Sequence, residues 1–304
     1  MGAGGAIGRC LADELTRQHK TVRLLGRQAY ATGFVESVKG DVGFLSDVVK
    51  SVKGSYVAYF CADQPERCYR RKERWSRIMD NVTEACIQEN VLLVSLDSFD
   101  VYGPVEGLIT ETTTYNSCSR SGEVRAGIAL QLQSEMQRKN IRAIIARAAD
   151  LYGPHAQHHG RFCRRAVRNW KKGKRARWMG SRDEPHSCSY TRDCAKAHSI
   201  LAESQFAQGQ LWHLPTSNPG LTGRQWAQLM DETLGANPNN KSGSLWAHKL
   251  WGYIDKVTVE LYEAGCQPKR VCQFDSSKFE GAFNFVPTSY RQGLKETLDF
   301  WNIL

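Results

Sequence analysis

The chain has 304 residues, of which 41% are hydrophobic and 24% charged; this globular composition is enough for one large or two moderate cores. No apolar run reaches the roughly 18–20 residues of a membrane helix and no secretory signal opens the chain, so we expect a cytoplasmic protein without membrane contact. Most of the net charge of +10 comes from residues 161–177, with nine basic residues and no acidic one, so the overall charge is a poor argument for nucleic-acid binding.

The first 150 residues alternate strand-like apolar runs with helical periodicity, which predicts βαβ units around a parallel sheet. Apolar residues recur every three or four positions after Ile7, Leu45 and Trp75, and again in a helix that starts near Gly122. The expected strands are residues 22–25, 56–62, 91–96 and 141–146.

A glycine-rich loop opens the chain, with Gly2, Gly5 and Gly8 leading into the helix of Ile7. Glycines let backbone N–H groups approach a pyrophosphate at the positive end of a helix, so the loop predicts a nicotinamide dinucleotide site. This fold needs a strand before the loop, where the sequence has only Met1. Two explanations stay open: a truncated or mis-assigned start, or a degenerate protein that holds a cofactor poorly.

Arg27 follows the strand of residues 22–25, where an acidic residue would bind the ribose 2′-hydroxyl of NAD. Because a guanidinium suits a 2′-phosphate, NADP(H) is the favoured cofactor, while NAD(H) stays open. A solvated arginine after a strand is the alternative interpretation.

Beyond Pro154 the alternation is less regular, with expected helices at residues 193–203 and 223–234 and a strand at 211–214. We therefore predict an α/β protein with a Rossmann-like, doubly wound parallel sheet that lacks its first strand. Residues 1–153 form the NAD(P)-binding domain. Residues 154–304 form a smaller, mainly substrate-binding α/β domain that is partly interleaved with the Rossmann sheet.

Metal binding is not expected from the spacing of the ligand types. The ten cysteines include no Cys-x-x-Cys pair and are interpreted as reduced thiols. His155, His158 and His159 have no neighbouring cysteine or carboxylate, which favours an exposed or cleft-lining loop.

Further segments fall in an ordered series: Gly40–Val42, Phe60–Ala62, Ser95–Gly103, Arg147–Pro154, Tyr190–Asp193 and Phe274–Phe279. With the glycine loop they resemble the extended short-chain dehydrogenase/reductase superfamily, in particular the NAD(P)-dependent epimerase/dehydratase family, over nearly the full chain. The resemblance implies a cofactor site formed by Gly2, Gly5, Ile7, Gly8, Arg27, Asp41, Val42, Cys61 and Ala62. It also implies that Ser98 hydrogen-bonds the reacting carbonyl.

The family's Tyr-x-x-x-Lys pair is absent, because no tyrosine of this chain has a lysine four residues on. By position Cys118 stands for the tyrosine and Gly122 for the lysine, and a glycine can neither bind ribose nor tune a pKa. Two substitutes stay open. Tyr115 is one, as a displaced acid; Cys118 is the other, with Arg120 or Arg125 as the cation beside it.

These features predict an NAD(P)-dependent oxidoreductase or epimerase/dehydratase that acts on a carbonyl or carbinol substrate with a non-standard acid/base. Nucleotide sugars are the commonest substrates of the family that the chain resembles, and the basic segment suits an anionic group. The alternative is a non-catalytic NADP(H)-binding sensor or regulatory protein of the same fold. No nucleic-acid partner is expected, and a homodimer is compatible with the sequence.

Overall fold

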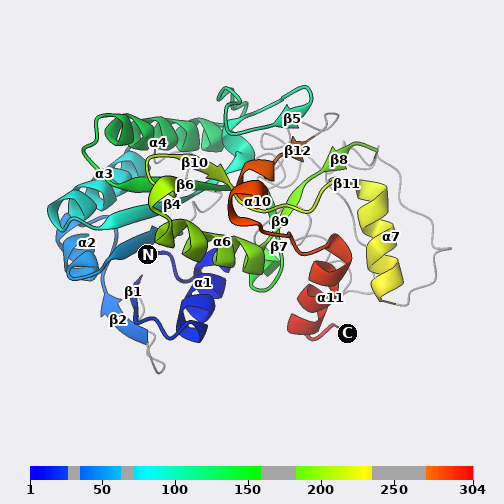
Figure 1. Cartoon of the computed structure of the whole chain (residues 1–304), viewed down its shortest axis with the longest axis horizontal. Coiled ribbons are helices and arrows are strands. Elements are labelled where there is room, and N and C mark those ends of the chain that lie inside the picture. Colours follow the sequence, from blue (N-terminus) through cyan, green and yellow to red (C-terminus); the bar gives the residue numbers. More distant parts are fainter. Residues whose placement is uncertain (27–34, 63–71, 159–182, 235–271, 304) are drawn as a thin grey trace, which may run out of the picture.

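A computed structural model describes residues 1–26, 35–62, 72–158, 183–234 and 272–303 (Figure 1). The helices are α1 Ala6–Arg17, α2 Leu45–Val52, α3 Lys72–Gln88, α4 Arg120–Gln137, α6 Thr191–Glu203, α7 Gly223–Thr233, α10 Ser277–Phe283 and α11 Tyr290–Phe300. The strands are β1 Val22–Gly26, β2 Val35–Lys39, β3 Val57–Phe60, β4 Leu92–Ser98, β5 Leu108–Ile109, β6 Ala143–Ala148, β7 Asp150–Tyr152, β8 Pro185–His186, β9 Cys188–Tyr190, β10 Leu211–His213, β11 Leu221–Thr222 and β12 Gln273–Phe274. None of these helices combines the length and the apolar character needed to cross a bilayer.

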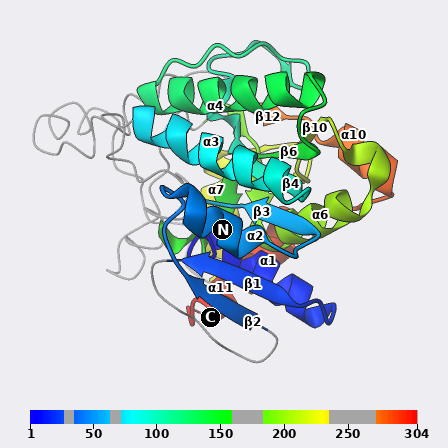
Figure 2. The same cartoon turned by 90° about the vertical axis from the view of Figure 1, so that its left-hand side faces the viewer.

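The central sheet has four parallel strands in the order β10-β6-β4-β3. A separate parallel pair, β1 and β2, lies beyond β3 (Figure 2). Helices α2, α3 and α4 cover one side of the sheet, and α1 and α6 cover the other. This arrangement confirms the predicted Rossmann-like, doubly wound fold.

Two hydrophobic cores fill the space between the sheet and its two helical layers. Alternate residues of β4 divide between them: Leu93 packs toward α2, α3 and α4, whereas Leu92 and Val94 pack toward α1 and α6. All three side chains are at most 2% exposed. Strands buried on both faces read as continuous apolar runs, which is why residues 91–96 are apolar almost throughout.

Met1 lies beside the last residues of β3. Its amino group donates a hydrogen bond to the Tyr59 carbonyl oxygen at 2.8 Å, and its own carbonyl oxygen accepts from the Cys61 N–H at 2.9 Å. These bonds to the residues on either side of Phe60 follow the pattern of a parallel strand. Burial lowers the pKa of the Met1 amino group.

Beyond the carboxyl end of the central sheet, short strands and two helices enclose a third core. Strand β7 pairs with β9, β8 with β11, and β12 with β5. Tyr152, Trp226 and Tyr290 form the centre of this core, and α7 packs against α11. The β5–β12 pair joins residues 108–109 to residues 273–274. A C-terminal segment therefore pairs with the segment that follows β4 in the chain.

Candidate functional site

The glycine loop is packed against the end of β3. Gly2 has φ +82°, and a Cβ added there would lie 2.6 Å from the Ala62 Cα. A Cβ on Gly8 would overlap the Gly2 carbonyl oxygen, so both positions need glycine. Ile7, only 2% exposed, anchors α1 in the core.

The start of α1 fits a pyrophosphate. Gly5 is the N-cap residue, no side chain caps the helix, and no acidic residue lies in its first turn. The first N–H groups of a helix need acceptors from outside the helix, and its N-terminus favours negative charge. The structure therefore brings together Gly2, Gly5, Ile7, Gly8, Cys61 and Ala62 of the predicted cofactor site.

Asp41 and Val42 follow β2 and lie beside α3, which carries Arg74 and Asn81. One carboxylate oxygen of Asp41 accepts the Gly43 N–H at 2.8 Å, and the other lies 3.8 Å from Arg74 Nη2. The Val42 carbonyl oxygen accepts from Asn81 Nδ2 at 3.1 Å. Arg27, the predicted ligand of a 2′-phosphate, lies outside the described residues.

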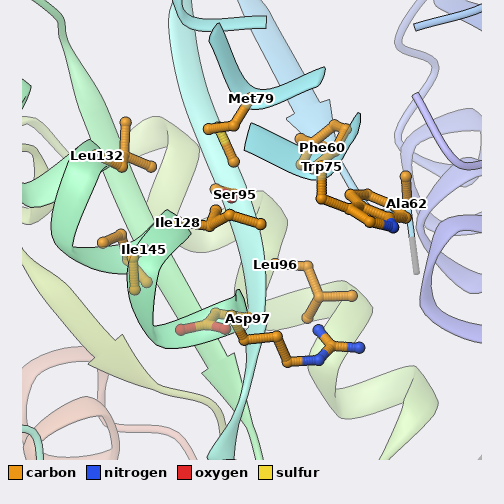
Figure 3. A pocket seen from close by; sticks show the side chains of 12 residues that line it. Phe60, Ala62, Trp75, Met79, Ser95, Leu96, Asp97, Ile128, Leu132 and Ile145 are labelled. Carbon is orange, nitrogen blue, oxygen red and sulfur yellow. The ribbon is translucent and has the colours of Figure 1, made fainter. Parts of the chain in front are cut away.

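A pocket lies at the carboxyl ends of β3 and β4, between the sheet and the layer of α3 and α4 (Figure 3). Ala62, Trp75, Leu96 and Asp97 line it, together with Arg125 from α4. Ala62 also supports the glycine loop, so the pocket and the start of α1 share a wall. Ligands of open α/β sheets bind at this edge, where parallel strands end.

Ser98 ends β4 and begins the short 3-10 turn Phe99–Val101. Its Oγ donates to Asp100 Oδ2 at 3.0 Å and accepts the Asp100 N–H at 3.4 Å. The N–H of Ser98 donates to Asp97 Oδ1 at 2.8 Å. The predicted carbonyl-binding serine is therefore held by carboxylates on both sides.

Arg147 donates hydrogen bonds both to Asp97, the residue before Ser98, and to Tyr115. Its Nε and Nη2 donate to Asp97 Oδ2 at 2.9 and 2.6 Å, and Nη2 also donates to the Tyr115 hydroxyl at 2.7 Å. The Arg147 side chain is 0% exposed and lies 4.6 Å from the centre of the Tyr115 ring. Although burial opposes it, the Asp97 carboxylate raises the pKa of Arg147. A permanent positive charge thus lies against the Tyr115 oxygen.

Tyr102 belongs to a second buried series of hydrogen bonds, which runs through His213 to the Asp275 carbonyl oxygen. His213 Nδ1 lies 2.7 Å from the Asp275 carbonyl oxygen, which can only accept, so Nδ1 carries the proton. Burial lowers the pKa of His213 to about 3, which keeps the ring neutral. Its Nε2 therefore accepts from the Tyr102 hydroxyl at 2.6 Å, and Tyr102 has no proton to give a substrate.

The segment that should carry the tyrosine and lysine pair differs from expectation in two ways. Cys118 is disulfide-bonded, so the interpretation of all ten cysteines as reduced thiols is wrong at this residue. A Cβ at Gly122 would overlap Ser117 Oγ and would lie 2.5 Å from the Asp100 carbonyl oxygen, because α4 packs closely on the 3-10 turn after Ser98. Position 122 therefore has no room for a lysine, and Arg125, one turn further along α4, is the cation at the pocket.

The turn after Ser98 is fastened to the Tyr115 loop at Gly103. Asn116 N–H donates to the Val101 carbonyl oxygen at 3.1 Å, and a Cβ on Gly103, which has φ +64°, would overlap the Asn116 carbonyl oxygen. The loop that carries Tyr115 is thus held directly on the segment that carries Ser98.

Gly103→Ala is expected to lower the free energy of unfolding. The left-handed backbone alone costs about 1–2 kcal/mol for a residue with a Cβ, and the loss should exceed this because the new methyl group also displaces the Tyr115 loop. Urea unfolding measures the change. Gly54→Ala is the matched control, since Gly54 has φ +71° with nothing within 4 Å of an added Cβ. Equal losses in the two variants would contradict the close contact at Gly103.

The site combines a Rossmann-like sheet, a glycine loop at an uncapped helix start, and a polar cluster of Asp97, Ser98, Tyr115 and Arg147 around the ends of β4 and β6. Together these features define an α/β protein of the dinucleotide-binding type. The chain belongs to the NAD dependent epimerase/dehydratase family, whose profile matches residues 1–213. No curated protein sequence matches it.

Solved structures of similar fold cover 99% of this chain. The UDP-glucose 4-epimerase of Thermotoga maritima, solved with UDP-glucose, is 17% identical with a TM-score of 0.78 over 97% of its own chain. The UDP-glucuronic acid 4-epimerase of Bacillus cereus, solved with UDP-glucuronic acid and NAD, is 15% identical with a TM-score of 0.78 over 97%. A dTDP-glucose 4,6-dehydratase of Streptomyces venezuelae, solved with NAD, is 18% identical with a TM-score of 0.76 over 95%.

The polar cluster contains residues that the sequence analysis did not select as site residues. Asp97 and Arg147 stand in segments that carry the family resemblance, yet their pairing depends on the β4–β6 register, in which Asp97 lies opposite Arg147. His213 comes from β10 and joins the cluster through the same sheet. Neighbouring strands that lie far apart in sequence leave no local spacing signal.

Proposed function

We propose that the chain is an NAD(P)-dependent enzyme that oxidises, reduces or epimerises a carbinol or carbonyl centre of a nucleotide sugar. The observation that carries the proposal is the buried Arg147, which joins the Tyr115 hydroxyl to Asp97, the neighbour of Ser98. Family membership and the nucleotide-sugar enzymes of similar fold support the substrate class.

The residues around α1 suit a dinucleotide. The N–H groups at the start of α1 would hold the pyrophosphate. Ala62 and the pocket beside it would hold the adjoining ribose, and Asp41 would bind the adenosine part of the cofactor. A bound nicotinamide supplies reversible hydride transfer. NADP(H) is our preferred form because of Arg27 alone, and titration with NADPH and NADH measures that preference.

Gly5→Asp is expected to weaken dinucleotide binding by about tenfold or more while the chain stays folded. Gly5 has φ −77°, which any residue adopts, and an aspartate at an N-cap caps its helix. Its charge would occupy the N–H groups and repel a pyrophosphate. Calorimetric titration measures the affinity, and the uncharged cap Gly5→Asn should lose less. Unchanged binding in Gly5→Asp would rule out a pyrophosphate at α1.

Tyr115 is the acid/base that we propose in place of the family tyrosine. The Tyr115 hydroxyl accepts a hydrogen bond from the Arg147 guanidinium, so a fixed positive charge lies beside it, as the lysine provides for the tyrosine of the Tyr-x-x-x-Lys pair. Ser98 would orient the substrate oxygen, and Tyr115 would take up or return the proton of the substrate hydroxyl. Cys118 is not proposed for this role, because its sulfur is in a disulfide and has no thiol proton.

A binding protein without catalysis is the second candidate. It is favoured by the hydrogen bonds that already engage both polar groups, Ser98 with Asp100 and Tyr115 with Arg147. Such a protein would bind a dinucleotide through the same glycine loop and turn over no substrate.

Ser98→Ala separates the two candidates. In an enzyme, loss of the hydroxyl that holds the reacting oxygen should lower kcat by about 10²-fold or more, with dinucleotide affinity unchanged. The assay follows the nicotinamide absorbance, and sugar products by chromatography, with UDP- and dTDP-sugars. A wild-type chain that binds dinucleotide but converts none of these sugars would leave the binding protein as the better description.

A further inference from the structure

Three side chains with metal-binding atoms meet beyond the end of the central sheet, outside the cluster of Ser98, Tyr115 and Arg147. They are Asp150 on β7, His186 on β8 and Cys188 on β9, and their ligand atoms all lie within 4.8 Å of one another. His186 Nε2 is 3.5 Å from Asp150 Oδ2. Asp150 is 7% exposed and Cys188 1%, so the donors are withdrawn from bulk water.

The strand register explains why these side chains converge. Asp150 lies opposite Cys188 in the parallel β7–β9 pair, and paired residues project to the same face of a sheet. His186 precedes Cys188 by two positions, which puts it on that face too. Cys272 lies opposite His186 in a parallel bridge, with its N–H donating to Pro185 and its carbonyl oxygen accepting from Ser187. A second sulfur, 1% exposed, therefore adjoins the imidazole.

This donor set suits zinc better than a hard cation. Zn²⁺ takes cysteine sulfur, histidine nitrogen and carboxylate oxygen, whereas Ca²⁺ and Mg²⁺ need a shell of oxygen atoms. Bonds of about 2.0–2.2 Å from a tetrahedral ion to nitrogen and oxygen place these two ligands about 3.4 Å apart. The distance of 3.5 Å between His186 and Asp150 is close to that value.

We propose that Asp150, His186 and Cys188 bind one Zn²⁺ ion, with Cys272 as the neighbouring source of a fourth ligand. The donors come from three stretches of chain, around residues 150, 186–188 and 272, so the ion would tie β7, β9 and the segment before β12 together. The His186 ring also contacts Phe99, the residue after Ser98, at 5.8 Å between ring centres. The site thus adjoins the proposed catalytic group without sharing a residue with it.

Cobalt titration of the full chain tests this assignment, because Co²⁺ replaces Zn²⁺ and reports its ligands by colour. After treatment with EDTA, we expect about one Co²⁺ per chain, a thiolate-to-cobalt charge-transfer band and its loss when Zn²⁺ displaces the cobalt. Cys188→Ser should abolish the charge-transfer band or greatly weaken it. Cys194→Ser is the matched control, since Cys194 is buried and free but lies on α6 outside the cluster, and it should keep the band.

Two further measurements keep the assignment testable if Cys188→Ser does not fold. Zn²⁺ should raise the Tm of the wild-type chain and EDTA should reverse the rise, because an ion that binds only the folded state stabilises it. Asp150→Asn keeps the side-chain size and should weaken Co²⁺ binding at least about tenfold. Failure of the folded wild type to bind Co²⁺, or a charge-transfer band unchanged by Cys188→Ser, would show that these donors form only an ion pair.

Discussion

Tyr115→Phe is expected to lower kcat by about 10²–10⁴-fold with little change in dinucleotide affinity, because it removes one hydroxyl and leaves the ring in place. In the wild type that hydroxyl accepts a hydrogen bond from Arg147 Nη2 at 2.7 Å. Arg147 keeps its two bonds to Asp97 in the variant, so the buried charge stays paired. The loss should therefore fall on the chemical step, and steady-state kinetics with single-turnover measurements would locate it.

Tyr56→Phe is the matched control for this variant. Tyr56 is 92% exposed and precedes β3, at the opposite end of the strand from the glycine loop and the pocket. Its loss of a hydroxyl should leave kcat and the free energy of unfolding unchanged. If Tyr115→Phe turned over substrate at the wild-type rate, Tyr115 would be only a packing partner of Arg147, and the acid would have to be sought elsewhere.

The fold of the first half could be predicted because its strands and helices carry strong apolar patterns. The expected helices after Ile7, Leu45 and Trp75 correspond to α1, α2 and α3, with small shifts at their ends. Strand β2 was missed, since Val35–Lys39 has five residues, only two of them apolar, and none of its side chains is fully buried. The expected strand of residues 56–62 is shorter in the structure, where β3 spans Val57–Phe60.

The candidate site was predicted only in part. The glycine loop and the end of β3 are adjacent as expected, because a helix that follows a glycine loop has few ways to pack on a parallel sheet. The pairing of Asp97 with Arg147 and Tyr115 depends on sheet register and on a loop, which local spacing does not reveal. The division at residues 153 and 154, the homodimer and the cytoplasmic location stay predictions.

Asp97→Ala is expected to cost about 3–5 kcal/mol in the free energy of unfolding, the largest stability loss that we predict for a single substitution in this chain. The Arg147 side chain is 0% exposed and that of Asp97 10%, so loss of the carboxylate leaves a guanidinium buried without its counter-charge. Arg147 already has one nitrogen, Nη1, without a hydrogen-bond partner among the described residues. Urea unfolding followed by circular dichroism measures the loss.

The exposed pair of Arg23 and Glu36 provides the control. Their side chains are 28% and 54% exposed, so Glu36→Ala should cost less than about 1 kcal/mol. The stability loss in Asp97→Ala comes from the unpaired, buried charge of Arg147. The double variant Asp97→Ala/Arg147→Met should therefore be more stable than Asp97→Ala alone. If the double variant were the less stable of the two, Arg147 would stabilise the fold without Asp97, through its contacts with the Tyr102 and Tyr115 rings. If the double variant recovered stability but not turnover, the structural role of the ion pair between Asp97 and Arg147 would be separated from its role in holding Tyr115.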